Sequence, residues 1–307
     1  MSFIRTNLAI CLLCLTCTAS AEISLTLKKS FVEKYKNRTT ITAECTVDHS
    51  KGKPNPASKD GDMHIAVRCQ KDIGLPAVAE IMNAKEALDA VNSANQLESS
   101  QEKTKITGAW RIWNEHGGDE SFKQGDQILQ ATNSNPDHVF EIHPISDFGG
   151  IDLSASFKKI EGYDAKKAED AFHRYENTRS RIRAKGTNVT IESPGLGYNY
   201  VEFQMELYSP PFPVDDGAFA YAKVRDWDGE LIHRKKRMVF VKGTPPEVAV
   251  RGGTEGNCWR VLGIPRVDLA LVSWRVKNSA KRPEILDWNL PYEIIVVAVY
   301  AEQCARD

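Results

Sequence analysis

The sequence predicts a mainly β (α+β) protein with two β-rich domains, of which the first is a small five-stranded barrel. Three observations support this class. Runs rich in Val, Ile, Thr and aromatic residues recur along most of the 307 residues. Clusters of Pro, Gly, Asn and Asp separate these runs, as is typical of antiparallel strands joined by turns. The cysteines beyond the N-terminal apolar segment form one early and one late pair, which fits two separately stapled domains.

Residues 1–21 have the pattern of a cleavable secretory signal peptide. Arg5 provides the positive charge, residues 8–15 are apolar, and Ala19-Ser20-Ala21 is a small-residue cleavage site. The apolar run is much shorter than the roughly 20 residues that a membrane-spanning helix needs. We therefore expect a soluble protein, exported to the periplasm or secreted and not embedded in a membrane. The predicted domains are residues 22–150 and 151–307.

Four cysteines follow the predicted signal peptide, namely Cys45, Cys69, Cys258 and Cys304. An even number in an exported protein predicts two disulfides, although four cysteines allow three pairings. Their positions favour Cys45–Cys69 and Cys258–Cys304. Buried free thiols are the alternative, and a zinc site is disfavoured because no C-x-x-C spacing occurs.

The predicted first domain begins with strands and contains one helix. A polar segment rich in Pro, Gly and Asp, residues 48–62, reads as the turn of a long hairpin. The helix is indicated by the near-helical spacing of its apolar residues. We expect strands at residues 39–47, 63–70, 74–82, 103–113 and 137–145, and the helix at residues 84–101. Three strands, a helix and two strands is the element order of the OB-fold barrel.

Three blocks in this region also resemble a known family. "DGDMHIAV", "ITGAWRIWNEHGG" and "HVFEIHPI" look like the motifs of bacterial exported OB-like domains, in which an Asp-Gly-Asp-x-His strand start, a Val-Thr-Gly strand and a Glu-Leu-His-Pro final strand recur in this order. Ile106 and Ile142 replace the Val and Leu of that pattern. The resemblance covers residues 39–148 and implies the OB-like fold. It implies no activity, since none is established for the family.

The predicted second domain begins with an amphipathic helix over residues 162–186, in which apolar residues recur at intervals of three to four. Strands should dominate the rest of the chain, and Asp228-Gly229 predicts a hairpin turn within residues 217–241. Further strands are expected at residues 198–208, 258–264, 269–276 and 292–301. We expect an antiparallel sandwich or barrel with one helix packed on it, and no family is recognised here.

Polar residues inside the last strand of the first domain raise the question of a metal site. Alternation places Glu141 and His143 on one face and His138 on the other, and it places Asp62 with His64. Asp62, His64, Glu141 and His143 are therefore candidate metal ligands on the outer surface of the barrel. Carboxylate and imidazole groups suit zinc, manganese or iron. The alternative is that these groups are solvated or hydrogen-bonded and fix strand ends.

Other residues indicate ligand binding. Trp110 and Trp113 have opposite parity in their strand, so one should be core and the other exposed. Trp113 and His116 are candidate residues for binding a sugar or peptide. Basic clusters at residues 179–185 and 233–237 could contact anionic surfaces. Nucleic acid is disfavoured because the net charge is −1 and residues 22–150 are mildly acidic.

No Gly-x-Ser-x-Gly elbow, Walker loop or dinucleotide fingerprint occurs in the sequence. We therefore expect an exported binding or structural protein without a cofactor, whose partner is a cell-envelope glycan, a peptide or a protein. The alternative is a metal-dependent hydrolase of the phosphodiesterase or nuclease type, which would use the Asp/His/Glu cluster and a divalent metal to activate water.

Overall fold

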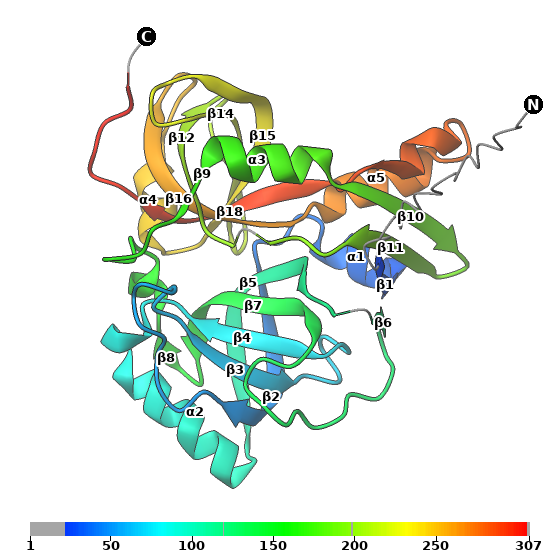
Figure 1. Cartoon of the computed structure of the whole chain (residues 1–307), viewed down its shortest axis with the longest axis vertical. Coiled ribbons are helices and arrows are strands. Elements are labelled where there is room, and N and C mark those ends of the chain that lie inside the picture. The colour runs from blue at the N-terminus through cyan, green and yellow to red at the C-terminus, as the bar shows by residue number, and fades with distance from the viewer. Residues whose placement is uncertain (1–21, 119, 198, 306–307) are drawn as a thin grey trace, which may run out of the picture.

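The computed structural model describes residues 22–118, 120–197 and 199–305. The predicted signal peptide, residues 1–21, lies outside this part of the chain. The fold is mainly β, as predicted, and contains two closed five-stranded barrels and a third sheet. Figure 1 shows the first barrel in the lower half of the molecule and the second barrel above it.

The first barrel has the OB strand order. Its strands are β2 (Thr40–Ser50), β3 (Met63–Arg68), β4 (Ala77–Ile81), β5 (Lys103–His116) and β7 (His138–Phe148). They follow the order β4-β3-β2-β5-β7, and a parallel pairing of β4 with β7 closes the barrel. Helix α2 (Leu88–Ser100) connects the third and fourth strands, after a short 3-10 helix at Ala84–Glu86, and β8 (Ile151–Asp152) extends the sheet from β7. The predicted barrel with one helix is confirmed.

Alternation of apolar and polar residues produces this barrel. In β2 the buried side chains of Ile41, Ala43, Cys45 and Val47 alternate with more exposed ones. The predicted disulfide Cys45–Cys69 joins the end of β2 to the residue after β3. Gly108 allows β5 to approach β7 closely, because a Cβ atom there would lie 2.5 Å from the backbone oxygen of Pro144.

The second barrel repeats this topology. Its strands are β12 (Val201–Leu207), β14 (Gly217–Arg225), β15 (Leu231–Val241), β16 (Cys258–Val267) and β18 (Tyr292–Val299). They pair in the order β14-β15-β18-β16-β12, and β12 pairs with β14 to close the barrel. The third and fifth strands, β15 and β18, are parallel, and helix α4 (Pro245–Val250) again lies between the third and fourth strands. The fold is therefore a barrel rather than a sandwich, with one parallel pair that the sequence did not predict.

The edges of this barrel carry two short strands, β13 (Phe212–Val214) and β9 (Lys166–Lys167). The predicted hairpin at Asp228-Gly229 joins β14 to β15. The predicted disulfide Cys258–Cys304 ties the start of β16 to the segment after β18. Both predicted disulfides are thus present.

A third sheet combines strands from distant parts of the chain. It contains β1 (Glu22–Lys28), β6 (Ser121–Lys123), β10 (Arg179–Lys185), β11 (Asn188–Pro194) and β17 (Asp287–Asn289), in the order β17-β10-β11-β1-β6. Strand β1 pairs antiparallel with β11 along its whole length. The first strand therefore belongs to the same sheet as strands of the second half, and the division of the chain near residue 150 stays a prediction.

Two segments differ from the predicted elements. Of the helix expected at residues 162–186, only α3 (Ala168–Asn177) is helical. Residues 179–185 form β10, because Ser180 and Ile182 are buried while their arginine neighbours are exposed, a period of two. Residues 269–276, expected as a strand, lie in helix α5 (Leu269–Asn278). The carboxylate of Asp268 accepts a hydrogen bond from the backbone N–H of Leu271 at 2.9 Å and caps this helix.

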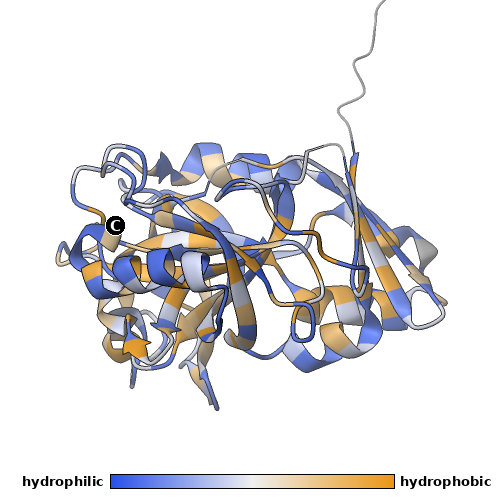
Figure 2. Cartoon of the chain, turned by 90° about the horizontal axis from the view of Figure 1, so that it is seen from below, coloured by the Kyte–Doolittle hydropathy of each residue, from blue (hydrophilic) through white to orange (hydrophobic). Residues whose placement is uncertain are grey.

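Helix α1 (Lys29–Tyr35) follows β1 and packs near α5. Figure 2 shows hydrophobic residues concentrated along the strands inside the molecule and hydrophilic residues in many peripheral loops. None of the helices in the described part of the chain has the length and apolar composition needed to cross a membrane.

Candidate functional site

The predicted metal ligands come from neighbouring strands of the first barrel. Asp62 immediately precedes β3, His64 lies on β3, and Glu141 and His143 lie on β7. Strand β4 pairs with both β3 and β7, and its residue Glu80 is directly opposite His64. The barrel therefore brings the four predicted residues together and adds Glu80, which the sequence analysis did not identify.

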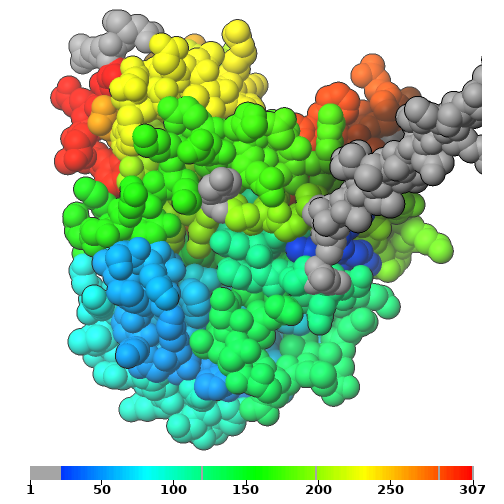
Figure 3. Space-filling view, viewed as in Figure 1, coloured from blue at the N-terminus to red at the C-terminus, as the bar shows by residue number. Residues whose placement is uncertain are grey.

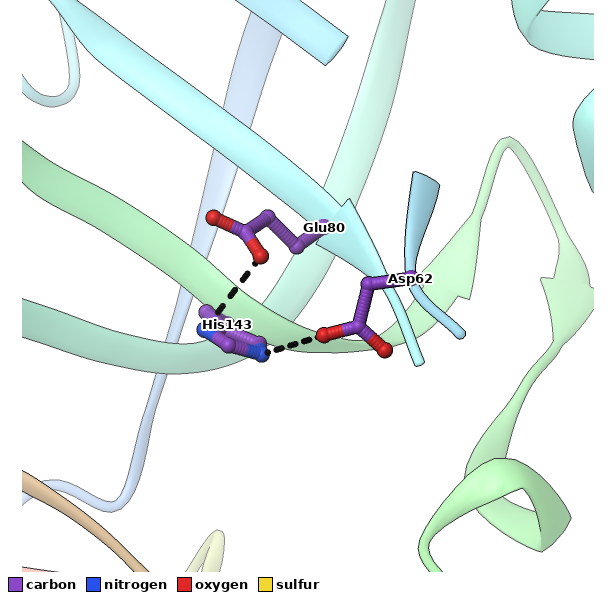
Figure 4. Close-up of side chains that lie close together, drawn as sticks. All are labelled: Asp62, Glu80 and His143. Atoms are coloured by element: carbon purple, nitrogen blue, oxygen red, sulfur yellow. Dashed lines mark ion pairs between the residues drawn. The ribbon is translucent and has the colours of Figure 1, made fainter. Parts of the chain in front are cut away.

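His143 is at the centre of this cluster. Its Nε2 atom lies 3.2 Å from Oδ2 of Asp62, and its Nδ1 atom lies 3.6 Å from Oε2 of Glu80 (Figure 4). The same Nδ1 atom is 3.4 Å from Oε2 of Glu141. Both ring nitrogens thus face carboxylates, which is the arrangement that a doubly protonated imidazolium requires.

His64 has a more peripheral position. Its Nε2 atom lies 3.5 Å from Oε2 of Glu80, and its side chain is partly exposed. Among the residues predicted as metal ligands, Asp62, Glu141 and His143 form the buried centre, whereas His64 contacts it only through Glu80.

The cluster is buried although it lies on the outer side of the barrel. Asp62 and His143 have 0% exposed surface, and Glu80 and Glu141 have 3% and 1%. Tyr200 from the second half of the chain contacts them, and Figure 3 shows the two halves packed directly against each other, the first in blue to teal below and the second in light green to red above. Tyr200, immediately before β12, donates its phenolic hydrogen to Oδ2 of Asp62 at 2.6 Å, and its oxygen is 2.9 Å from Nε2 of His143.

Arg111 on β5 connects the same cluster to the second barrel. Its guanidinium donates to Glu141 at 2.5 Å, to Glu115 at 3.0 Å and to the backbone oxygen of Pro265 at 2.9 Å. The last acceptor lies on β16. Arg111 is completely buried, and the carboxylates of Glu141 and Glu115 balance its charge.

Burial and neighbouring charges shift the pKa values of Glu141, His143 and Asp62. Burial alone would raise the pKa of Glu141, but Arg111 and His138 lower it well below its usual range. Burial alone would lower the pKa of His143, but Glu80 and Asp62 raise it well above the usual value. For Asp62, burial raises the pKa to about 6 in spite of His143. The cluster therefore favours a charged His143 and a charged Glu141, and burial makes Asp62 the carboxyl group with the raised pKa.

A second group of polar residues lies at the end of β5. Ligand atoms of Glu115, His116 and Glu141 are all within 4.8 Å of one another. His138 stacks on His116 with ring centroids 5.1 Å apart, and its Nε2 atom is 3.4 Å from Oε1 of Glu141. The expectation that His138 faces away from Glu141 is therefore wrong: His138 is at the start of β7, opposite His116 where the pairing with β5 is irregular, and its ring reaches Glu141.

Trp113 is not the exposed ring that parity allowed. Both Trp110 and Trp113 are buried, because the second half of the chain covers the outer face of β5. Trp113 packs edge-on against Tyr175 of α3 at 5.5 Å between centroids. Of the two predicted ligand-binding residues, only His116 is partly exposed, so an exposed tryptophan platform is excluded at this position.

The two basic clusters lie on strands. Residues 179–185 form β10 of the third sheet rather than the end of a helix, with their arginines exposed. Residues 233–237 lie on β15, where Lys236 and Arg237 are buried and Lys235 is exposed. Only part of the second cluster is thus available to a ligand.

The residues of the buried cluster fit a metal ion in composition but already form a balanced network. Ligand atoms of Asp62, Glu80 and His143 lie within 4.8 Å of one another, and Oδ1 of Asp62 and Oε2 of Glu80 have no hydrogen-bond partner. Two carboxylates and one imidazole suit zinc or manganese. A metal would need one deprotonated nitrogen of His143, whereas both nitrogens face carboxylates.

The sequence contained a weak signal for the missed residues. Arg111 and Glu80 lie within strands that otherwise read as apolar, and a charged residue inside a buried strand indicates a partner on the neighbouring strand. Tyr200 gave no such signal, because its partner lies 138 residues away.

Neither a comparison with models of known protein families nor a search among curated proteins found a match for this chain.

Proposed function

We propose that the protein is an exported binding or structural protein, in which the buried cluster joins the two OB-like barrels and is not an active site. The observation that carries this proposal is the burial of the cluster. A substrate would have to reach His143 and Asp62, which have no exposed surface and are covered by Tyr200 from the second half. Catalytic groups need access to the reacting atoms, while groups that connect two units do not.

Further contacts between the barrels support the structural role. Arg266 on β16 is completely buried and lies over the ring of Trp110 at 3.6 Å. It donates to the backbone oxygens of Thr39 at 3.1 Å and Trp110 at 3.0 Å. From the loop before β14, the carboxylate of Asp216 accepts hydrogen bonds from two backbone N–H groups at the start of the first barrel, at 3.0 and 2.9 Å. Polar contacts of this kind fix the orientation of the two units.

Export is supported by the two disulfides, because such bonds persist in oxidising compartments.

A panel of glycans, peptidoglycan fragments and peptides tests the binding function with the full mature chain. We expect at least one of these classes to bind and the Asp62→Asn variant to bind equally well, since Asp62 lies away from accessible surface. No binding in this panel, together with a hydrolytic activity that Asp62→Asn abolishes, would contradict the proposal.

The second candidate function is a metal-dependent hydrolase, favoured by the unpartnered carboxylate oxygens of Asp62 and Glu80. Asp62, Glu80 and His143 would hold the ion, which would supply a polarised water molecule. Metal analysis of the purified protein, and thermal unfolding with and without a chelator, separate the two functions. We expect no stoichiometric metal and no shift on adding zinc or manganese. Stoichiometric metal that stabilises the fold by several degrees would favour the hydrolase.

A further inference from the structure

The second barrel carries an exposed group of aromatic residues beside cations, which we call the aromatic face and define as Tyr208, Phe212, Tyr221 and Lys235. Tyr208 and Phe212 are 46% and 39% exposed, although large apolar groups are usually covered. Phe212 lies 6.2 Å from Tyr221 between ring centroids. Nζ of Lys235 lies 4.8 Å from the ring centre of Tyr221 and 5.3 Å from that of Tyr208. The four residues therefore form one contiguous surface.

The position of this surface follows from the fold. Tyr221 and Lys235 lie on β14 and β15, the second and third strands of the barrel, while Tyr208 and Phe212 lie in the connection between its first and second strands. In Figure 1 these strands are in the upper part of the molecule, whereas β3, β4 and β7, which carry residues of the buried cluster, are in its lower half. The face of the second and third strands and the loop before them are where OB barrels bind oligonucleotides and oligosaccharides.

Charged and polar groups continue the aromatic face. Lys223 donates to Glu206 at 2.5 Å and Arg225 donates to the same carboxylate at 2.9 Å, so these two cations share one anion. Glu206 and Arg225 also line a pocket of about 500 Å³. Asn257 and Gln303, which carry amide groups, also line it. The surface thus runs from neighbouring aromatic rings through a cationic segment to a polar pocket.

We propose that this surface binds an acidic oligosaccharide. Sugar rings present apolar C–H faces that pack on aromatic rings, carboxylates pair with lysine and arginine, and hydroxyl groups hydrogen-bond with amides. Nucleic acid fits less well, because its affinity depends on neutralising many phosphates and the whole chain has a net charge of −1. The inference rests on the proposed binding function and names its ligand class and surface.

The test uses isothermal titration of the full mature chain with a tetrasaccharide of galacturonic acid. The methyl ester of that tetrasaccharide removes the charge and keeps the rings, and an oligothymidylate represents nucleic acid. We expect the acidic tetrasaccharide to bind, its ester to bind more weakly, and the affinity to fall with added salt. Preferred binding of the oligothymidylate would overturn the choice of ligand.

Variants test the surface itself. Lys235→Gln removes one exposed charge and should weaken binding about fivefold. Tyr208→Ala removes one stacking ring and should weaken binding about tenfold. Lys185→Gln, on the exposed end of β10 in the third sheet, is the matched control and should leave the affinity unchanged. Circular dichroism checks that all three variants are folded.

Two failures are distinguishable. If the acidic tetrasaccharide binds equally to the wild type, Lys235→Gln and Tyr208→Ala, the binding function survives and the assignment of this surface is wrong. If the protein binds neither this tetrasaccharide nor any glycan, peptidoglycan fragment or peptide, and hydrolyses a substrate instead, the proposed function is wrong as well.

Discussion

Replacing His143 by glutamine tests whether the buried cluster holds the barrels together. The imidazolium faces Asp62 through one nitrogen, and Glu80 and Glu141 through the other. Glutamine cannot carry the positive charge, so three buried carboxylates would be left with Arg111 as the principal counter-charge. Removing one partner of a buried ion pair costs about 3–5 kcal/mol. Because the glutamine amide can still donate to one carboxylate, we expect a loss near the lower end of this range.

The loss can be measured as a change in thermal or urea unfolding. About 3 kcal/mol corresponds to a decrease of roughly 6 °C in Tm, using about 2 °C per kcal/mol for a long chain. The matched control is His49→Gln, which removes a surface ion pair between His49 and Glu98 at 2.9 Å. Exposed pairs of this kind contribute about 0–1 kcal/mol. Equal shifts in the two variants would refute the reasoning.

A double variant sharpens this test. Asp62→Asn removes one of the carboxylates that His143→Gln leaves without a counter-charge. The double variant should therefore be more stable than His143→Gln alone, whereas two independent losses would add. Additive losses would show that the two side chains do not interact through their charges.

Three further predictions concern pH, the barrel contact and a strand crossing. The folded-state pKa of His143 is raised, so the stability that it contributes is complete below the unfolded pKa of about 6.5 and is lost as pH rises through the folded value. For this group the free energy of unfolding should fall by about 1.4 kcal/mol per pH unit above pH 6.5, and His143→Gln should reduce the measured slope by that amount, while His138, whose pKa is also raised, keeps its own part of the slope. Tyr200→Phe leaves Asp62 without its 2.6 Å donor and should lower the free energy of unfolding in urea by about 1–3 kcal/mol; an unchanged midpoint would argue against a contact that stabilises the fold. Gly108→Ala would place a Cβ atom 2.5 Å from the backbone oxygen of Pro144, and calorimetry should show a lower Tm, because backbone atoms at this crossing cannot move aside as a flexible side chain can.

Local sequence patterns predicted the elements whose environment is simple. The alternation in residues 39–47 and the turn residues after them produce the hairpin of the first barrel, and the order of elements predicted its topology. The disulfides followed from the positions of the cysteines. For the hairpin, neighbours in the chain determine the structure, so periodicity and turn residues were sufficient; the paired cysteines are 24 and 46 residues apart, and their grouping into one early and one late pair was sufficient.

Helix α5 shows why some elements were not predictable. Residues 269–276 contain enough β-branched and aromatic residues to read as a strand, but capping by Asp268 and packing beside α1 select the helix. Helix α3 was predicted too long because the arginine run after it also fits helical spacing. Tertiary context decides such cases, and a local pattern contains no information about it.

The candidate cluster illustrates the same limit. Period-two alternation grouped Glu141 with His143, which lie 3.4 Å apart, and grouped Asp62 with His64, which contacts Glu80 at the edge of the cluster. It could not identify Glu80 and Tyr200, since their places depend on strand pairing and on contact between the barrels. Residues distant in the chain determine whether these side chains face water or the second barrel. Side chains that face water would be accessible ligands, whereas those that face the second barrel form a buried connection.

The third sheet also affects the order in which the chain can fold. Thr26 on β1 shares a hydrogen bond with Thr190 on β11, 164 residues later. During synthesis β1 emerges early but has to wait for β11 before this ladder can form. Closing so long a loop is entropically unfavourable and slow compared with forming hairpins. The first barrel can therefore assemble before β11 is available, while β1 has β6 as its possible neighbour, and pairing of β1 with β11 becomes a late step that joins β1 to the second half of the chain.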